Sequence, residues 1–119
     1  MKSLNFTHKR DKIWNGEKTQ TIRTLFFPTF EENEIVLLKF KKKPLFEVQI
    51  TEIYIKKIKD LTKEEAKRDG FNSKEELIKA LLEINHLKSN NRFCAVIKFK
   101  RVSERLDKFL TKGSEKYEV

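Results

Sequence analysis

The sequence contains a single cysteine, Cys94, in 119 residues, so an internal disulfide and a multi-cysteine zinc site are both excluded. Cys94 lies in an apolar run, where a free thiol behaves as a small hydrophobic side chain. The two histidines, His8 and His86, are far apart in the sequence, and neither has neighbours at metal-ligand spacing. We therefore expect neither a metal site nor a bound cofactor.

Glycine and long apolar runs are also scarce. The three glycines are isolated from one another, so no glycine-rich loop is available to hold a nucleoside triphosphate. The longest aliphatic run, residues 35–38, is far too short to span a bilayer. The first residues lack the apolar stretch of a signal peptide. These absences favour a soluble, cytoplasmic protein that makes no contact with a membrane.

Positive charge is abundant. Lysine and arginine number 27 against 18 acidic residues, which gives a net charge of +9. The excess is +5 in residues 1–60 and +4 in residues 61–119, so any basic patch must be assembled by folding. A balance of this size favours polyanionic partners such as nucleic acid. Surfaces rich in lysine and glutamate also arise from solubility or heat adaptation, so charge alone does not decide the function.

Hydrophobic alternation predicts four strands, and turn residues separate them. A short helix over 8–14 is expected to end at Asn15-Gly16, and residues 24–33, which include several phenylalanines, are expected to form a loop. In the second of the two long strands, the apolar residues change parity near Thr51, which predicts a bulge or a sharp bend. The expected strands are 18–23, 34–40, 45–55 and 93–99, the last with Phe93, Ala95, Ile97 and Phe99 on one face.

Two helices with clear N-terminal signals are expected between the third and fourth strands. Thr62 with Glu65, and Ser73 with Glu76, have the spacing of capping boxes, and Gly70 is suited to end the first helix. The second helix should bury one apolar stripe. That stripe consists of Leu77, Ile78, Leu81, Leu82 and Ile84. A further short helix around Leu106, Phe109 and Leu110 is expected after the last strand, followed by a frayed tail.

This order of elements predicts an α+β fold: a small, mostly antiparallel β-barrel flanked by helices. Residues 1–102 would form one domain, and residues 103–119 a C-terminal extension. A monomer is the favoured state.

The segment from Lys18 to Arg23 concentrates residues that suit chemistry or binding. On a strand, Thr21 and Arg23 share a face, and a hydroxyl beside a guanidinium makes a good site for an oxyanion or phosphate. The alternative is that both residues occupy an exposed strand face without a function. Lys18 and Thr21 are three positions apart, so they converge only if Lys18 precedes the strand.

Four segments in collinear order resemble the ASCH domain family. They are 15–23, 34–37, 61–71 and 96–99, and the resemblance extends over residues 3–101. Its most specific features are a Gly-x-Lys-Thr-x-Thr-Ile-Arg block and a downstream Ala-x-x-Asp-Gly-Phe block. Asn33-Glu34 stands where the family usually has Gly-Asp, and we expect only a local change of turn there.

The resemblance implies a barrel related to PUA domains and, for the family in general, RNA binding. Some small bacterial members are amidohydrolases that release the acetyl group of N4-acetylcytidine. Their lysine, threonine and glutamate match Lys18, Thr21 and Asp69 of this sequence. The aspartate is a departure, because it shortens the reach of the carboxylate by about 1.5 Å.

Two functions follow as hypotheses. In the first, the protein hydrolyses an N4-acylated cytidine, with Thr21 as nucleophile, Lys18 as base, Asp69 as acid or orienting group and Arg23 as oxyanion partner. In the second, the same cleft binds RNA without catalysis, and Phe26, Phe27 or Phe30 stacks a base. The residues expected to bind RNA or a nucleoside are Lys18, Thr19, Thr21, Arg23, Lys41 and Lys42. RNA cleavage is a third possibility, although no His–His or His–Lys pair recommends it.

Overall fold

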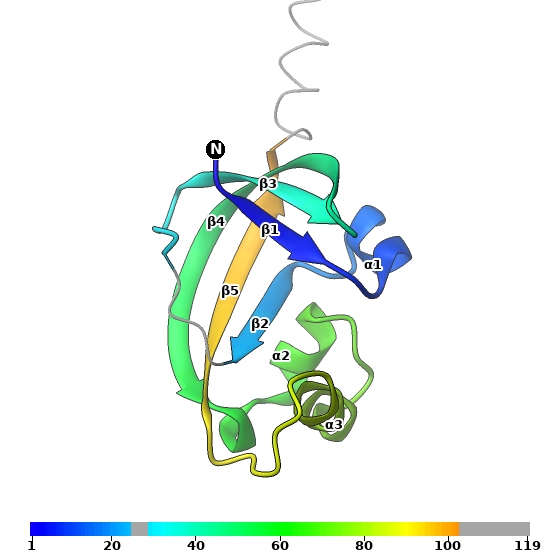
Figure 1. Ribbon diagram of the computed structural model, residues 1–119, viewed down its shortest axis with the longest axis vertical. Helices are drawn as coiled ribbons and strands as arrows, with labels where there is room; N and C mark the ends of the chain where they lie inside the picture. Colours follow the sequence, from blue (N-terminus) through cyan, green and yellow to red (C-terminus); the bar gives the residue numbers. More distant parts are fainter. Residues whose placement is uncertain (25–28, 103–119) are drawn as a thin grey trace, which may run out of the picture.

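The computed structural model describes residues 1–24 and 29–102, which form one curled sheet with helices at its side (Figure 1). The sheet has five strands in the order β1-β3-β4-β5-β2. The strands are β1 (Ser3–Phe6), β2 (Gln20–Thr24), β3 (Ile35–Phe40), β4 (Lys43–Lys57) and β5 (Phe93–Arg101). The helices are α1 (Arg10–Trp14), α2 (Lys63–Arg68) and α3 (Lys74–Ile84), with a 3-10 turn, η1 (Ile58–Asp60), after β4.

Strand pairing explains the curl of the sheet. The pairs β3–β4, β4–β5 and β5–β2 are antiparallel, whereas β1 pairs with β3 in parallel. The register between β4 and β5 shifts between Ile50 and Glu52, which confirms the bulge predicted from the change of parity. Because β4 is long and bent there, it brings the two edge strands, β1 and β2, toward each other (Figure 1). The expected barrel is therefore a half-barrel with an open seam.

Two hydrophobic clusters hold the sheet and the helices together. The first lies inside the curl and consists of Leu4, Phe6, Ile13, Val36, Leu38, Phe46, Val48, Ile50, Ile97 and Phe99. The second lies between the sheet and helices α2 and α3, and consists of Ile22, Ile58, Leu61, Ala66, Leu77, Leu81, Cys94 and Val96. Strand β5 contributes to both clusters, so its residues 94–97 are buried on both faces. The α+β class predicted from the sequence is confirmed.

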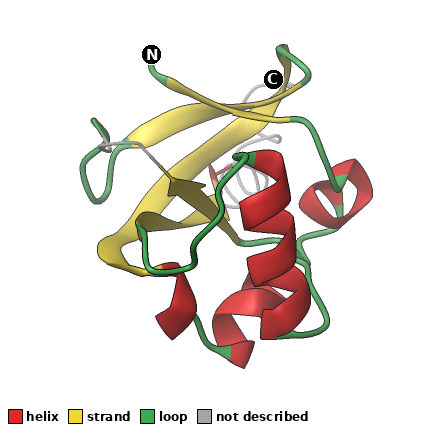
Figure 2. Cartoon of the chain, turned by 60° about the horizontal axis from the view of Figure 1, so that its bottom comes forward, coloured by secondary structure: helices red, strands yellow, loops and turns green. Residues whose placement is uncertain are grey.

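The helices gather on one side of the sheet (Figure 2). Helix α2 begins with the predicted capping box, in which Thr62 and Glu65 satisfy each other's backbone amides. It is followed by Gly70 at φ +86°, which a residue with a side chain adopts only with strain. At α3 the Ser73 hydroxyl accepts from the amide of Glu76, but the Glu76 carboxylate accepts from the amide of Asn72. The second capping box is therefore only half formed.

Several details differ from the sequence-based expectation. Strand β1 and the turn η1 were not predicted, because a four-residue strand and a three-residue turn carry too little periodicity to detect. Ile84 is 54% exposed, because it lies at the last turn of α3, beyond the buried Leu77 and Leu81. Phe93 is 62% exposed, because it pairs with Lys57 at the end of the sheet, past the core.

Some predictions fall outside the described residues. They are the part of the expected loop that contains Phe26, Phe27 and Pro28, and the C-terminal extension with its expected helix. Within residues 1–24 and 29–102, no helix has the length and apolar character needed to cross a bilayer.

Candidate functional site

A cavity of about 690 Å³ lies at the seam between the two edge strands. Residues of β1 and β2 line it, together with the end of α2 and one face of α3. Lys18, Thr21, Arg23 and Asp69 all line this cavity, so the structure brings together the four side chains selected from the sequence.

Lys18 reaches the cavity because it precedes the strand. Gly16, at φ +85°, turns the chain after α1, and the amide of Lys18 donates to the carbonyl of Lys12 at 2.9 Å. Strand β2 begins only at Gln20, so the alternation that would separate Lys18 from Thr21 does not apply. The Lys18 side chain is 7% exposed, and its Nζ lies 3.0 Å from Oδ2 of Asp69.

Asp69 is the C-cap residue of α2 and is 5% exposed. Its Oδ2 pairs with Lys18, while its buried Oδ1 makes no hydrogen bond within the part of the chain that the structure describes. Burial raises the pKa of Asp69, and the charge of Lys18 opposes that rise. Burial likewise lowers the pKa of Lys18, against the attraction of Asp69. The two groups are therefore closer in proton affinity than they are in water, which eases proton transfer between them.

Arg23 connects Thr21 to the opposite strand across the seam. Its Nε donates to Oγ1 of Thr21 at 3.0 Å, and its Nη2 donates to the carbonyl of Asn5 at 3.0 Å. The guanidinium also lies 5.1 Å from the ring centroid of Phe6, and burial lowers the pKa of Arg23. Because the Thr21 oxygen accepts from Arg23, its own hydrogen remains available to a base or a ligand.

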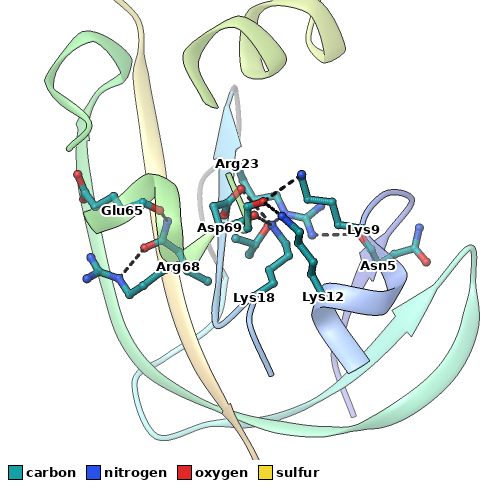
Figure 3. A network of polar contacts seen from close by, with 11 residues as sticks. Asn5, Lys9, Lys12, Lys18, Arg23, Glu65, Arg68 and Asp69 are labelled. Carbon is teal, nitrogen blue, oxygen red and sulfur yellow. Dashed lines mark hydrogen bonds and ion pairs between the residues drawn. The ribbon is translucent and has the colours of Figure 1, made fainter. Parts of the chain in front are cut away.

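Three lysines converge on the C-terminal end of α2 (Figure 3). Lys9 and Lys12 donate to the carbonyl of Gly70 at 3.1 and 2.6 Å, and Lys18 donates to the carbonyl of Asp69 at 3.1 Å. The last carbonyls of a helix lack partners within the helix, so these ammonium groups satisfy them. The three contacts hold Asp69 against α1 and the turn before β2.

The other side of α2 is fixed by Glu65. Its carboxylate accepts from the hydroxyl of Tyr54 and from Nζ of Lys56, the latter at 2.8 Å. Its backbone carbonyl accepts from Nε2 of Gln20 at 2.8 Å, and the Gln20 Oε1 in turn accepts from Nε of Arg68 at 3.1 Å. Helix α2 is thus connected to both β4 and β2, and Asp69 has little freedom to move.

The Tyr54–Glu65 contact leads to a spectroscopic prediction. Burial, with the hydrogen bond to Glu65 as the second cause, raises the pKa of Tyr54 to about 12. The sequence has two tyrosines, so an ultraviolet titration of the native protein should show a separate phenolate step near that pH. The step should disappear in Tyr54→Phe and move to lower pH in Glu65→Gln. An unshifted step in Glu65→Gln would show that this contact does not hold Tyr54 protonated.

Three residues predicted to bind ligand lie outside the cavity lining. The backbone of Thr19 connects the start of β2 to α2, because the Thr19 amide donates to the carbonyl of Arg68 at 2.8 Å. Lys41 and Lys42 form the turn between β3 and β4, at φ +48° and +69°. The amide of Lys42 donates to Oδ1 of Asn5 at 2.7 Å, so this turn supports β1, and neither lysine side chain lines the cavity.

The sequence reasoning missed Asn5, Phe6, Lys9 and Phe71 as lining residues. Asn5 and Phe6 belong to the strand that was not predicted, and Lys9 precedes a helix whose orientation the sequence does not give. Phe71 was part of the Asp-Gly-Phe block and could have been selected from it. Its ring lies 4.0 Å from Nζ of Lys9.

Two other kinds of chemistry find no support in residues 1–24 and 29–102. No group of three or more histidine, cysteine, aspartate or glutamate side chains converges there in a way that could hold a metal ion. Cys94 is buried, and burial raises the pKa of its thiol to about 11, so the reactive thiolate is scarce at neutral pH.

Comparison with known proteins supports the resemblance seen in the sequence. The family model of the ASCH domain matches residues 3–103. No curated protein matches the chain.

Two solved structures share the fold. One is the ASCH domain from Lactobacillus crispatus JV V101, with a TM-score of 0.66 and 14% identity, covering 85% of this chain and 79% of that one. The other is a protein from Enterococcus faecalis V583, with a TM-score of 0.59 and 14% identity, covering 77% of this chain and 68% of that one. At this identity the likeness establishes the fold alone.

Proposed function

Because this chain belongs to the ASCH domain family, whose members are generally thought to bind RNA, we propose that its cavity binds an N4-acylated cytidine and hydrolyses the acyl group. One observation carries the proposal: the buried Lys18–Asp69 pair lies in the same cavity as the Thr21–Arg23 pair. A nucleophile, a base whose pKa is lowered and a cation for an oxyanion are thus available to one bound molecule.

The first half of the reaction transfers the acyl group to Thr21. Neutral Lys18 takes the hydroxyl proton as Oγ1 attacks the acyl carbonyl, and the guanidinium of Arg23 stabilises the negative charge on the carbonyl oxygen. The carbon–nitrogen bond then breaks, and the proton on Lys18 passes to the departing exocyclic nitrogen. Cytidine leaves, and Thr21 carries the acyl group as an ester.

The second half restores the enzyme with one water molecule. Lys18 takes a proton from the water as it attacks the ester, and the proton returns to Thr21 Oγ1 when the ester bond breaks. A carboxylic acid leaves. Asp69 orients Lys18 throughout and accepts its proton when the amine must be neutral, a role favoured by the raised pKa of Asp69 and the lowered pKa of Lys18.

The family's glutamate is replaced here by Asp69, and the contacts of α2 compensate for the shorter side chain. The ammonium of Lys18 also donates to the backbone carbonyl of Asp69 at 3.1 Å, so the lysine reaches to the end of the helix. A contact of 3.0 Å between Nζ and Oδ2 lies within hydrogen-bond reach despite the missing methylene. The aspartate therefore meets the distance requirement for a group that orients a base.

The cavity has the size and character of a small-molecule site. Its 690 Å³ fall within the range of roughly 300–1,000 Å³ common for ligand pockets. Apolar side chains cover much of its wall and suit the faces of a base, whereas the polar groups are few and concentrated. The apolar lining consists of Leu4, Phe6, Ile22, Phe30, Phe71, Leu77, Ala80, Leu81 and Ile84.

Binding of RNA without hydrolysis is the second candidate function. The observation in its favour is the basic lining, since Lys2 and Lys9 line the cavity together with Lys18 and Arg23 in a chain of net charge +9. Cations at a cavity mouth attract phosphates and increase the rate of encounter. This function needs no neutral lysine and no nucleophile.

The test of hydrolysis is direct. Purified protein is incubated with N4-acetylcytidine, and the release of acetate and cytidine is followed by chromatography. Lys18→Met should reduce turnover by at least about 100-fold, because a general base contributes that much or more. Lys39→Met serves as the matched control, since Lys39 lies on β3 and does not line the cavity. Equal turnover in the two variants would refute the role of Lys18.

Absence of turnover in the unmodified protein would leave binding as the function. Titration with single-stranded RNA at several salt concentrations then measures the number of phosphates contacted, Z, from a log–log slope near −0.7Z. A slope of zero would remove the second candidate as well.

A further inference from the structure

Two buried polar atoms lack hydrogen-bond partners among the described residues, and the side chains of both line the same cavity. They are Oδ1 of Asp69 and Oγ1 of Thr24. The Thr24 side chain belongs to a residue that is only 8% exposed. The Asp69 side chain has partners through its other oxygen, whereas the Thr24 hydroxyl has none in the described part of the chain. Buried polar groups in folded proteins nearly always have a partner, so the exception at Thr24 inside a cavity points to a bound molecule that supplies the missing bond.

Thr24 lies at the opposite end of the cavity from the Lys18–Asp69 pair. It is the last residue of β2, three positions after Thr21, which corresponds to about 10 Å along an extended strand. Strand β1 ends beside the beginning of β2, and the far end of β2, which is Thr24, points away from it (Figure 1).

Other hydroxyl-bearing residues line the same cavity. Ser3 and Thr29 belong to its lining together with Lys2, whose Nζ donates to the carbonyl of Thr29 at 2.6 Å. A lining with several hydroxyls suits a group with hydroxyls of its own, which can both donate and accept.

We infer that Thr24 binds a ribose hydroxyl of the nucleoside whose acylated base lies at Lys18 and Asp69. The inference rests on the proposed function, because it places the reactive end of the ligand at Lys18. The exocyclic nitrogen and the sugar hydroxyls lie at opposite ends of a cytidine, as Lys18 and Thr24 lie at opposite ends of the cavity. Thr24 would then make the site select cytidine over the analogue that lacks the bound hydroxyl, 2′-deoxycytidine or 3′-deoxycytidine.

The experiment measures binding of the product, so it does not require turnover. Affinities for cytidine, 2′-deoxycytidine and 3′-deoxycytidine are determined by calorimetry for the unmodified protein, Thr24→Val and Thr24→Ser. We expect cytidine to bind about tenfold more tightly than at least one of the deoxy analogues, the scale of one hydrogen bond. Thr24→Val should reduce that ratio to about one, and Thr24→Ser should keep it. Equal binding of all three nucleosides by the unmodified protein would overturn the inference.

The ligand-free protein gives a second readout. Thr24→Val removes a buried hydroxyl that has no partner, so the melting temperature should rise by about 4 °C. A fall of similar size would show that the hydroxyl has a structural partner, and would overturn the inference.

The two proposals fail in different ways. Hydrolysis of N4-acetylcytidine and of its 2′-deoxy and 3′-deoxy analogues at equal rates would refute the role of Thr24 and leave the amidohydrolase intact. Selective binding of cytidine without hydrolysis of N4-acetylcytidine would refute the amidohydrolase and support the role of Thr24.

Discussion

Thr21→Val should reduce kcat/KM for N4-acetylcytidine by about 10³-fold or more, because it removes the atom to which the acyl group is transferred in the proposed mechanism. Valine has nearly the shape of threonine, so the cavity keeps its volume. The Nε of Arg23 loses its acceptor, and we expect this to cost stability of about 1–2 kcal/mol without unfolding the protein. Steady-state kinetics of acetate release, with circular dichroism to confirm folding, measures the effect.

Thr19→Val is the matched control for this change. Thr19 lies two residues before Thr21 in the chain. It forms hydrogen bonds through its backbone, and it does not line the cavity. Its substitution should leave kcat/KM within about threefold of the unmodified protein, as expected for a residue whose side chain touches neither substrate nor base. Thr21→Ser should keep measurable activity, since a hydroxyl remains. If Thr21→Val retained more than a tenth of the activity, Thr21 would not be the nucleophile, and water would have to attack the acyl group directly.

Asp69→Ala should lower the free energy of unfolding by about 3–5 kcal/mol, because it leaves the ammonium of Lys18 buried without its anion. Urea denaturation at pH 7 measures this change. The double variant Lys18→Met/Asp69→Leu removes both charges and should recover most of the loss, since apolar replacements of a buried pair are often neutral. If the double variant were as unstable as Asp69→Ala, the loss would come from packing and not from an unpaired charge.

The instability of Asp69→Ala should also depend on pH in a defined direction. Burial already holds the pKa of Lys18 below 10.5 in the folded protein, and removal of Asp69 takes away the main influence that raises it. Between the folded pKa and 10.5 the unfolded chain binds more protons than the folded chain, so stability increases with pH in that window. The difference in the free energy of unfolding between Asp69→Ala and the double variant should therefore become smaller as the pH is raised toward 10.

Local signals in the sequence predicted the elements that support the site. The change of parity near Thr51 indicated the bulge that curls the sheet, and the capping box at Thr62 located the start of the helix that ends at Asp69. These features could be predicted because each depends on residues within a few positions of one another. Gly16 was predicted to end the first helix, but the expected strand included Lys18, and only the structure shows that β2 begins at Gln20.

The seam between β1 and β2, and the contacts between the residues that line it, could not be predicted from local signals. Strand β1 pairs in parallel with β3, which lies more than thirty residues later in the chain. The residues Ser3–Phe6 contain no signal that identifies β3 as their partner. The convergence of Lys9 and Lys12 on Gly70 joins residues about sixty positions apart. The basic turn at Lys41 and Lys42 had the charge expected of a binding site, but it lies outside the cavity lining, because its backbone supports β1 instead.

By itself, the sequence determined the α+β class, the sheet with its bulge, and the candidate site residues Lys18, Thr21, Arg23 and Asp69. Only the tertiary structure decided that these side chains line one cavity, that Lys18 and Asp69 are buried as a pair, and that Thr24 lines the same cavity. The physical reason is that strand and helix patterns are local, whereas burial and the pKa shifts it causes depend on segments that meet only after the sheet has curled.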